Sequence, residues 1–124
     1  MSHRVQITFD AAHPPSLARF WALALGYVDN PPPEGFDSWD AWGDAVGIPE
    51  DQRDSRWALV DPDGDGPRLF FQQVPEGKVA KNRVHLDVSV SGGPAVPLED
   101  RRPIVDDKVA ELIAAGATQL DRFD

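Results

Sequence analysis

The chain has 124 residues, room for one domain, and its 41% hydrophobic and 27% charged content is ordinary for a soluble globular protein. Twelve basic against 21 acidic residues give a net charge of −9, which argues against nucleic acid and anionic membranes as partners, because both require a basic surface. The absence of cysteine excludes disulfides, thiolate nucleophiles and cysteine-bound zinc, and without a signal peptide or a long apolar run we expect a cytoplasmic protein.

The amino-terminal part of the sequence predicts a strand, a helix and a second, short strand. Apolar and polar residues alternate over 4–9, which is typical of a half-buried strand. Pro14-Pro15-Ser16 can begin a helix with a broad apolar stripe, and Gly26 is its natural end. A short strand over 27–28 then follows.

The next part predicts a short helix and a β-hairpin. Ser38 is a suitable cap for a helix over 39–46. Residues 56–60 and 68–74 predict two strands, separated by the turn-rich segment 61–67. That segment also imitates the start of a calcium loop, but strands flank it where helices should be, so a hairpin turn is the better interpretation.

The pattern restarts after a polar linker at 75–82. Residues 84–90 alternate like the first strand, and a helix is predicted over 104–115, ending at Gly116. Residues 117–120 could begin another strand. The restart indicates an internal duplication.

We therefore predict an α+β fold made of paired βαβββ modules, which form an open curved sheet around a cleft. The first module is expected at 1–75. The second, at 83–124, is incomplete because its final hairpin is absent, so the chain is either a single domain of this reduced form or a fragment of a longer protein.

Several motifs resemble the vicinal oxygen chelate superfamily, and more narrowly its glyoxalase-like domain proteins. The resemblance covers most of the chain, and its most specific part is the boundary between the modules. The motifs that carry it are Leu17-Ala18-Arg19-Phe20-Trp21, Leu25-Gly26-Tyr27, Asp61-Pro62-Asp63-Gly64, Val74-Pro75-Glu76-Gly77-Lys78, Lys81-Asn82-Arg83-Val84-His85-Leu86-Asp87-Val88, Glu111-Leu112 and Gly116-Ala117-Thr118.

The resemblance implies that a cleft between the modules holds the ligand. Many members bind a divalent metal there through residues of the first and last strands of each module, and the two first-strand positions fall on Gln6 and His85. The last strand of the first module usually supplies a glutamate, but here it has no carboxylate, and Gln72 is the nearest polar candidate. A divalent metal at Gln6 and His85 is therefore weakly supported, because such ions prefer imidazole and carboxylate donors.

The remaining candidate ligand-binding residues are Thr8, Asp87, Trp39 and Trp42. Thr8 shares the polar face of its strand with Gln6, and Asp87 shares one with His85, although Asp87 could equally be a surface carboxylate. The two tryptophans could line or cover the pocket, or they could simply be buried in the core.

These residues favour a glyoxalase-like protein that binds a small molecule through aromatic and polar side chains. One alternative is a metal-dependent lyase, isomerase or dioxygenase of the same superfamily. Another is a non-catalytic dimeric assembly protein. A truncated second sheet would leave a strand edge exposed, so we expect a homodimer or a partly disordered carboxyl end, unless the chain is a fragment of a longer protein.

Overall fold

The computed structural model describes residues 2–122 and shows two compact units, Met1–Val79 and Ala80–Asp124. The boundary falls within residues 75–82, the segment predicted as a linker. The interpretation of both units as one domain, with modules at 1–75 and 83–124, stays a prediction.

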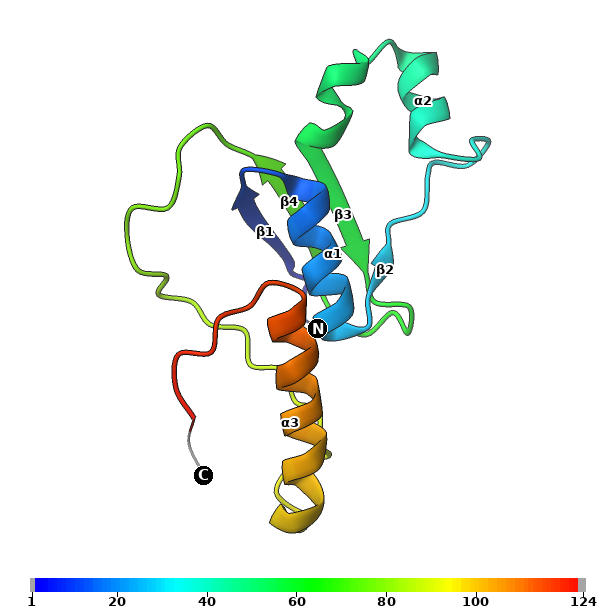
Figure 1. Ribbon diagram of the computed structural model, residues 1–124. Helices are drawn as coiled ribbons and strands as arrows, with labels where there is room; N and C mark the ends of the chain where they lie inside the picture. Colours follow the sequence, from blue (N-terminus) through cyan, green and yellow to red (C-terminus); the bar gives the residue numbers. More distant parts are fainter. Residues whose placement is uncertain (1, 123–124) are drawn as a thin grey trace. The chain divides into compact units, whose positions relative to one another are not determined.

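The first unit is an α+β arrangement in which a helix follows the first strand (Figure 1). Apart from the α2–η1 segment inserted after β2, its element order is βαβββ, and this mixed arrangement confirms the predicted α+β class. The elements are β1 (Gln6–Ala11), α1 (Pro14–Leu25), β2 (Val28–Asp29), α2 (Trp39–Val46), the 3-10 helix η1 (Glu50–Ser55), β3 (Arg56–Val60) and β4 (Arg68–Gln73).

The four strands form one open mixed sheet in the order β1-β4-β3-β2. β1 runs parallel to β4, with Gln6 opposite Arg68 and Ala11 opposite Gln73. β4 pairs antiparallel with β3, which confirms the predicted hairpin, and β3 pairs antiparallel with β2. Within residues 2–122, β1 is therefore an edge strand whose only ladder partner is β4.

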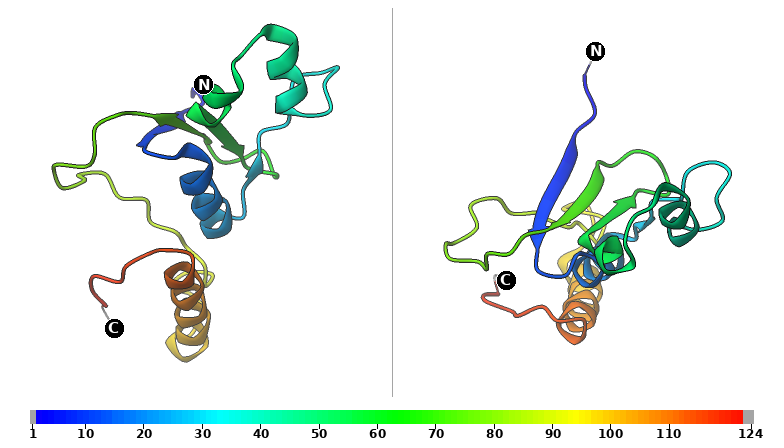
Figure 2. Two further views of the ribbon diagram at one scale, coloured as in Figure 1. Left: turned by 45° about the horizontal axis from the view of Figure 1, so that its top comes forward. Right: turned by 90° about the horizontal axis from the view of Figure 1, so that it is seen from above.

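Helix α1 packs against one face of this sheet (Figure 2). The buried centre consists of Ala18 from α1, Leu59 from β3, and Leu69 and Phe71 from β4. Around it pack the partly buried side chains of Ile7, Phe9, Leu17, Trp21, Ala22, Leu25, Tyr27 and Trp57. Because side chains alternate across a strand, the intervening residues of β1 and β4 face away from α1.

Local sequence signals determine the ends of the α-helices α1 and α2. α1 begins with the predicted prolines and ends at Gly26, which has the left-handed backbone that glycine tolerates best. Its cap is His13, whose Nδ1 accepts a hydrogen bond from the Ser16 N–H at 3.3 Å. Ser38 caps α2 as predicted, since its hydroxyl accepts a hydrogen bond from the Ala41 N–H at 3.0 Å.

Asp61 organises the turn that joins β3 to β4. Its carboxylate accepts hydrogen bonds from the Asp63 N–H at 2.9 Å and the Gly66 N–H at 2.7 Å. These bonds stabilise the charged form and so lower the pKa of Asp61. Gly66 lies so close to Tyr27 that a Cβ here would collide with the phenol oxygen. Burial, and secondarily the charge of Asp61, raises the pKa of Tyr27.

The second unit contains the helix α3 (Leu98–Ala114), which begins earlier than the predicted 104–115 and includes Pro103. The strands predicted over 84–90 and 117–120 are wrong, because neither segment is a strand in the structure. The alternation at 84–90 is genuine, but a strand needs a hydrogen-bonded neighbour. β1, its counterpart, has only β4 as a neighbour, and residues 80–122 include no strand that could take that role.

No helix among residues 2–122 combines the length and the apolar character that are needed to cross a membrane.

Candidate functional site

The sheet face that points away from α1 is the candidate site. Its residues alternate with those of the buried centre, and they are exposed or half-buried. We call this surface the polar sheet face, and it is formed by Gln6, Thr8 and Asp10 of β1 and by Arg68, Phe70 and Gln72 of β4.

Two hydrogen-bonded pairs link the two strands across this face. The Gln6 Oε1 atom accepts a hydrogen bond from Arg68 Nη1 at 2.6 Å. In the second pair, Gln72 Nε2 donates a hydrogen bond to Asp10 Oδ1 at 2.7 Å. Both pairs are in register between the parallel strands, so the strand pairing itself brings together side chains from distant parts of the sequence.

Two contacts position Arg68 on the polar sheet face. Besides its bond to Gln6, its guanidinium carbon lies 5.6 Å from the centroid of the Phe70 ring. A cation over an aromatic face is attracted by the ring electrons. Within residues 2–122, Arg68 forms no ion pair with a carboxylate. Its positive charge is therefore held in place by two neutral groups.

The donors around Gln6 do not fit the divalent metal that the resemblance implies. The oxygen that would coordinate the ion already accepts a hydrogen bond from Arg68, and the guanidinium charge would repel a cation at that oxygen. In the described part of the chain, no group of three His, Asp or Glu side chains is arranged to hold a metal ion. These contacts give no support to a metal-binding role for Gln6.

Sequence reasoning missed three members of this face, namely Asp10, Arg68 and Phe70. Asp10 continues the two-residue period of Gln6 and Thr8, but the predicted strand ends one residue too early to include it. Arg68 and Phe70 follow from the same period, counted back from Gln72. The two-residue alternation of β1 and β4 could therefore have identified all three residues from the sequence.

His85 and Asp87 belong to the second unit, whereas Gln6 belongs to the first. Both lie in the segment 84–90 and both are exposed. Their predicted contact with the ligand, and the predicted shared cleft, stay predictions.

Trp39 and Trp42 lie on α2 and pack against each other edge to face, with ring centroids 5.5 Å apart. The Trp39 indole N–H donates to the backbone carbonyl of Asn30 at 2.8 Å, which ties α2 to the segment after β2. These contacts give both rings a structural role, and their predicted role in covering the ligand stays a prediction.

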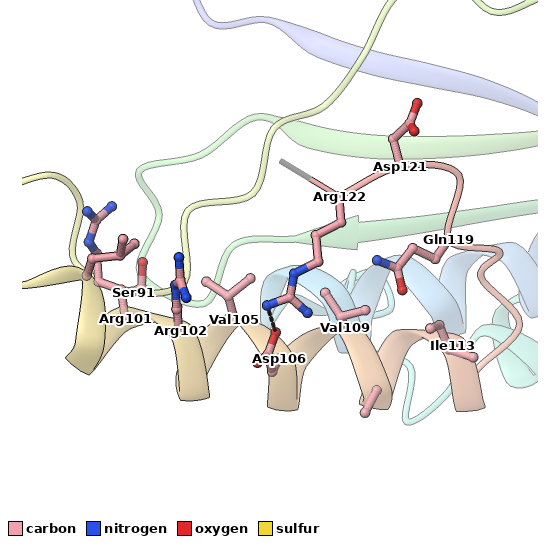
Figure 3. Close-up of a pocket in the computed structure, with 12 residues that line it drawn as sticks. Ser91, Arg101, Arg102, Val105, Asp106, Val109, Ile113, Gln119, Asp121 and Arg122 are labelled. Atoms are coloured by element: carbon pink, nitrogen blue, oxygen red, sulfur yellow. Dashed lines mark ion pairs between the residues drawn. The ribbon is translucent and has the colours of Figure 1, made fainter. Parts of the chain in front are cut away.

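The second unit has an open hollow of 550 Å³ along α3 (Figure 3). Its apolar side includes Val105, Val109 and Ile113, and its rim includes an ion pair between Arg122 and Asp106, with a nitrogen–oxygen distance of 3.2 Å. Val105 and Ile113 are 39% and 43% exposed. The hollow thus combines half-exposed apolar side chains of α3 with polar and charged groups from α3 and from residues 119–122.

Comparison with known proteins identifies the family. A family model described as a glyoxalase-like domain matches residues 6–124, nearly the whole chain. The chain therefore belongs to the glyoxalase-like domain family. No curated protein and no solved structure matches the chain significantly.

Proposed function

We propose that this chain is a small-molecule-binding protein of the vicinal oxygen chelate superfamily and that its ligand lies on the polar sheet face. The observation that supports this proposal most directly is the fixed arrangement of Arg68, Gln6 and Phe70 on an exposed sheet surface. A ligand site typically combines an apolar contact surface with a few positioned polar groups, and this face has both.

The positioning lowers the cost of binding. Arginine and glutamine lose rotamer freedom when a ligand fixes them, but here the strand ladder and the Gln6–Arg68 hydrogen bond have already done so. In this proposal, Thr8, Gln72, His85, Asp87, Trp39 and Trp42 supply additional contacts.

The test is a fragment screen by nuclear magnetic resonance on the ¹⁵N-labelled full chain, with neutral, anionic and cationic aromatic compounds. We expect at least one class to shift the backbone amides of β1 and β4 and the side-chain amides of Gln6 and Gln72. If compounds shift only amides of α3, or no amides at all, the proposal is wrong.

A metal-dependent lyase, isomerase or dioxygenase is the alternative that the resemblance offers. It would require oxygen or nitrogen donors free to coordinate a metal at the first and last strands. The Gln6 oxygen faces a guanidinium instead, so the contacts of this face favour binding without a metal.

A second candidate, a dimeric assembly role, is favoured by the segment 84–90. This segment has the alternation of a strand but pairs with no strand in the described part of the chain, and Val84 is 79% exposed. Unpaired backbone of this kind readily pairs with a strand of another molecule. In this candidate function, the occupant is the same segment of a second copy of the chain, which would complete the hydrogen bonds of both.

Light scattering after size exclusion, over a range of protein concentrations, tests this pairing. Val88→Pro removes a backbone donor within the segment and should shift a dimer towards monomer. Val79→Pro is the matched control, since Val79 is 97% exposed and lies outside the segment. A monomeric wild-type chain, or an equal effect of both variants, would contradict the dimer.

A further inference from the structure

The charge of Arg68 is unusual in so acidic a chain. The chain carries 21 acidic residues against 12 basic ones, so a half-buried arginine would be expected to find a carboxylate partner. Arg53 shows what such pairing looks like, with one nitrogen 2.6 Å from an oxygen of Asp44 and another 3.6 Å from one of Asp40. Arg68 instead bonds to the neutral amide of Gln6.

The carboxylate on the same face is too distant to neutralise Arg68. Asp10 is four residues further along β1 than Gln6, the register partner of Arg68. At about 3.3 Å per residue, this is a separation of roughly 13 Å. Exposed charges are largely screened beyond about 8 Å at physiological ionic strength. Asp10 also accepts a hydrogen bond from Gln72, so it already has a partner.

Arg68 retains most of its hydrogen-bonding capacity. A guanidinium has five N–H groups in a planar fork that matches the two oxygens of a carboxylate. Within the described residues, only Nη1 donates a hydrogen bond, and its acceptor is Gln6. The remaining donors can therefore bind an anion without breaking the contacts that hold the side chain.

The surroundings of Arg68 indicate what the anion is attached to. Phe70 is half-buried and pairs in register with Thr8 on one side and with Ala58 on the other. This row offers an aromatic ring, a methyl group and a threonine side chain, and it lies one pleat away from Arg68 on the same face. It suits a flat apolar body next to a charged head group.

We propose that Arg68, positioned by Gln6 and Phe70, binds the carboxylate of a small organic acid whose apolar body lies over the Phe70 row. This inference rests on the proposed function and names its ligand class. The fixed positive charge that the resemblance assigns to a metal at Gln6 is supplied here by a guanidinium, so recognition of the acid requires no metal.

The test compares benzoate with benzamide, its neutral analogue of similar shape, by ¹⁵N chemical-shift titration of the full chain without added metal. Wild type should bind benzoate about tenfold or more tightly than benzamide, because hydrogen bonds to charged groups are the stronger ones. Arg68→Gln should remove this preference, because it should weaken the binding of benzoate far more than the binding of benzamide. Thermal unfolding of each variant confirms that it is folded.

Arg56→Gln is the matched control. Arg56 lies opposite Gln72 in the β3–β4 ladder. It is therefore on the same face of the sheet as Arg68, but near the opposite end of β4. The variant loses the same charge, and benzoate affinity should change by less than about twofold, since the charge is remote and screened.

The outcomes separate the inference from the function on which it rests. If Arg68→Gln binds benzoate as wild type does, or Arg56→Gln weakens it equally, Arg68 is not the anion site. If neutral fragments bind the polar sheet face and benzoate has no advantage over benzamide, the inference fails and the proposed function stands. If no compound shifts the amides of this face, both fail.

Discussion

Two neighbouring phenylalanines on β4 test how the sheet is oriented. Phe71 is fully buried, and its ring stacks on Phe9 with centroids 5.2 Å apart. Phe70 is half-buried on the opposite face. The same substitution at the two positions should therefore have very different effects on the free energy of unfolding.

The expected loss for Phe71→Ala follows from its contacts. Burying a phenylalanine side chain stabilises a fold by about 1.5–3 kcal/mol, and a ring pair such as Phe71 with Phe9 adds about 0.5–1.5 kcal/mol. With the cavity that alanine leaves, the total is about 3–5 kcal/mol. Phe70→Ala loses partial burial and the contact with Arg68, for which we expect about 1 kcal/mol.

Urea unfolding followed by tryptophan fluorescence measures both losses, because Trp21 and Trp57 pack on the core cluster. If Phe71→Ala does not fold, Phe71→Leu and Phe70→Leu provide the same comparison with smaller losses. A larger loss at position 70 than at position 71 would refute the assignment of the two faces, and with it the polar sheet face.

Three further predictions concern the hairpin turn and the metal. Since the pKa of Asp61 is lowered on folding, its stabilisation is present above the ordinary value of 3.8 and is lost as the pH falls through the folded value. Asp61→Asn should therefore unfold at a lower urea concentration than wild type at pH 7, and the difference between the two midpoints should become smaller in acid. A difference in midpoint that does not change with pH would contradict the role of the carboxylate. Gly66→Ala should cost about 1–3 kcal/mol through its clash with the Tyr27 hydroxyl, and the Tyr27→Phe background should reduce that cost in a double-mutant cycle of urea unfolding. Titration with Ni²⁺ or Zn²⁺ should leave the side-chain amide signals of Gln6 unshifted, and a saturable shift would show that a metal binds there after all.

Local structure was the part of the fold that the sequence predicted well. The short helix over 39–46 was predicted with Ser38 as its capping residue, and the structure has it at Trp39–Val46. The hairpin was likewise predicted from two apolar runs around a dense turn. Such signals lie within a few residues of the structure that they determine, so one sequence is enough to find them.

Non-local pairing explains why the prediction at 84–90 failed and why the contact between Gln6 and Arg68 was not predicted. The alternation at 84–90 describes a segment that is ready to become a strand, whereas strand formation depends on a neighbour elsewhere in the chain. The contact between Gln6 and Arg68 depends in the same way on the parallel pairing of β1 with β4. Periodicity shows which way each side chain points, but it does not show which residue lies opposite.

The Gln6–Arg68 contact joins residues that are 62 positions apart, through an edge strand with a single neighbour. Closing so long a loop is entropically unfavourable, whereas the β3–β4 hairpin can form locally, so β1 is expected to join the sheet late in folding. A ligand bound to Arg68 while Gln6 holds it would add free energy to the docking of β1. Ligand binding would then slow amide hydrogen exchange in β1 more than in the β3–β4 hairpin. The exchange rate of β1 would therefore show whether the ligand is bound.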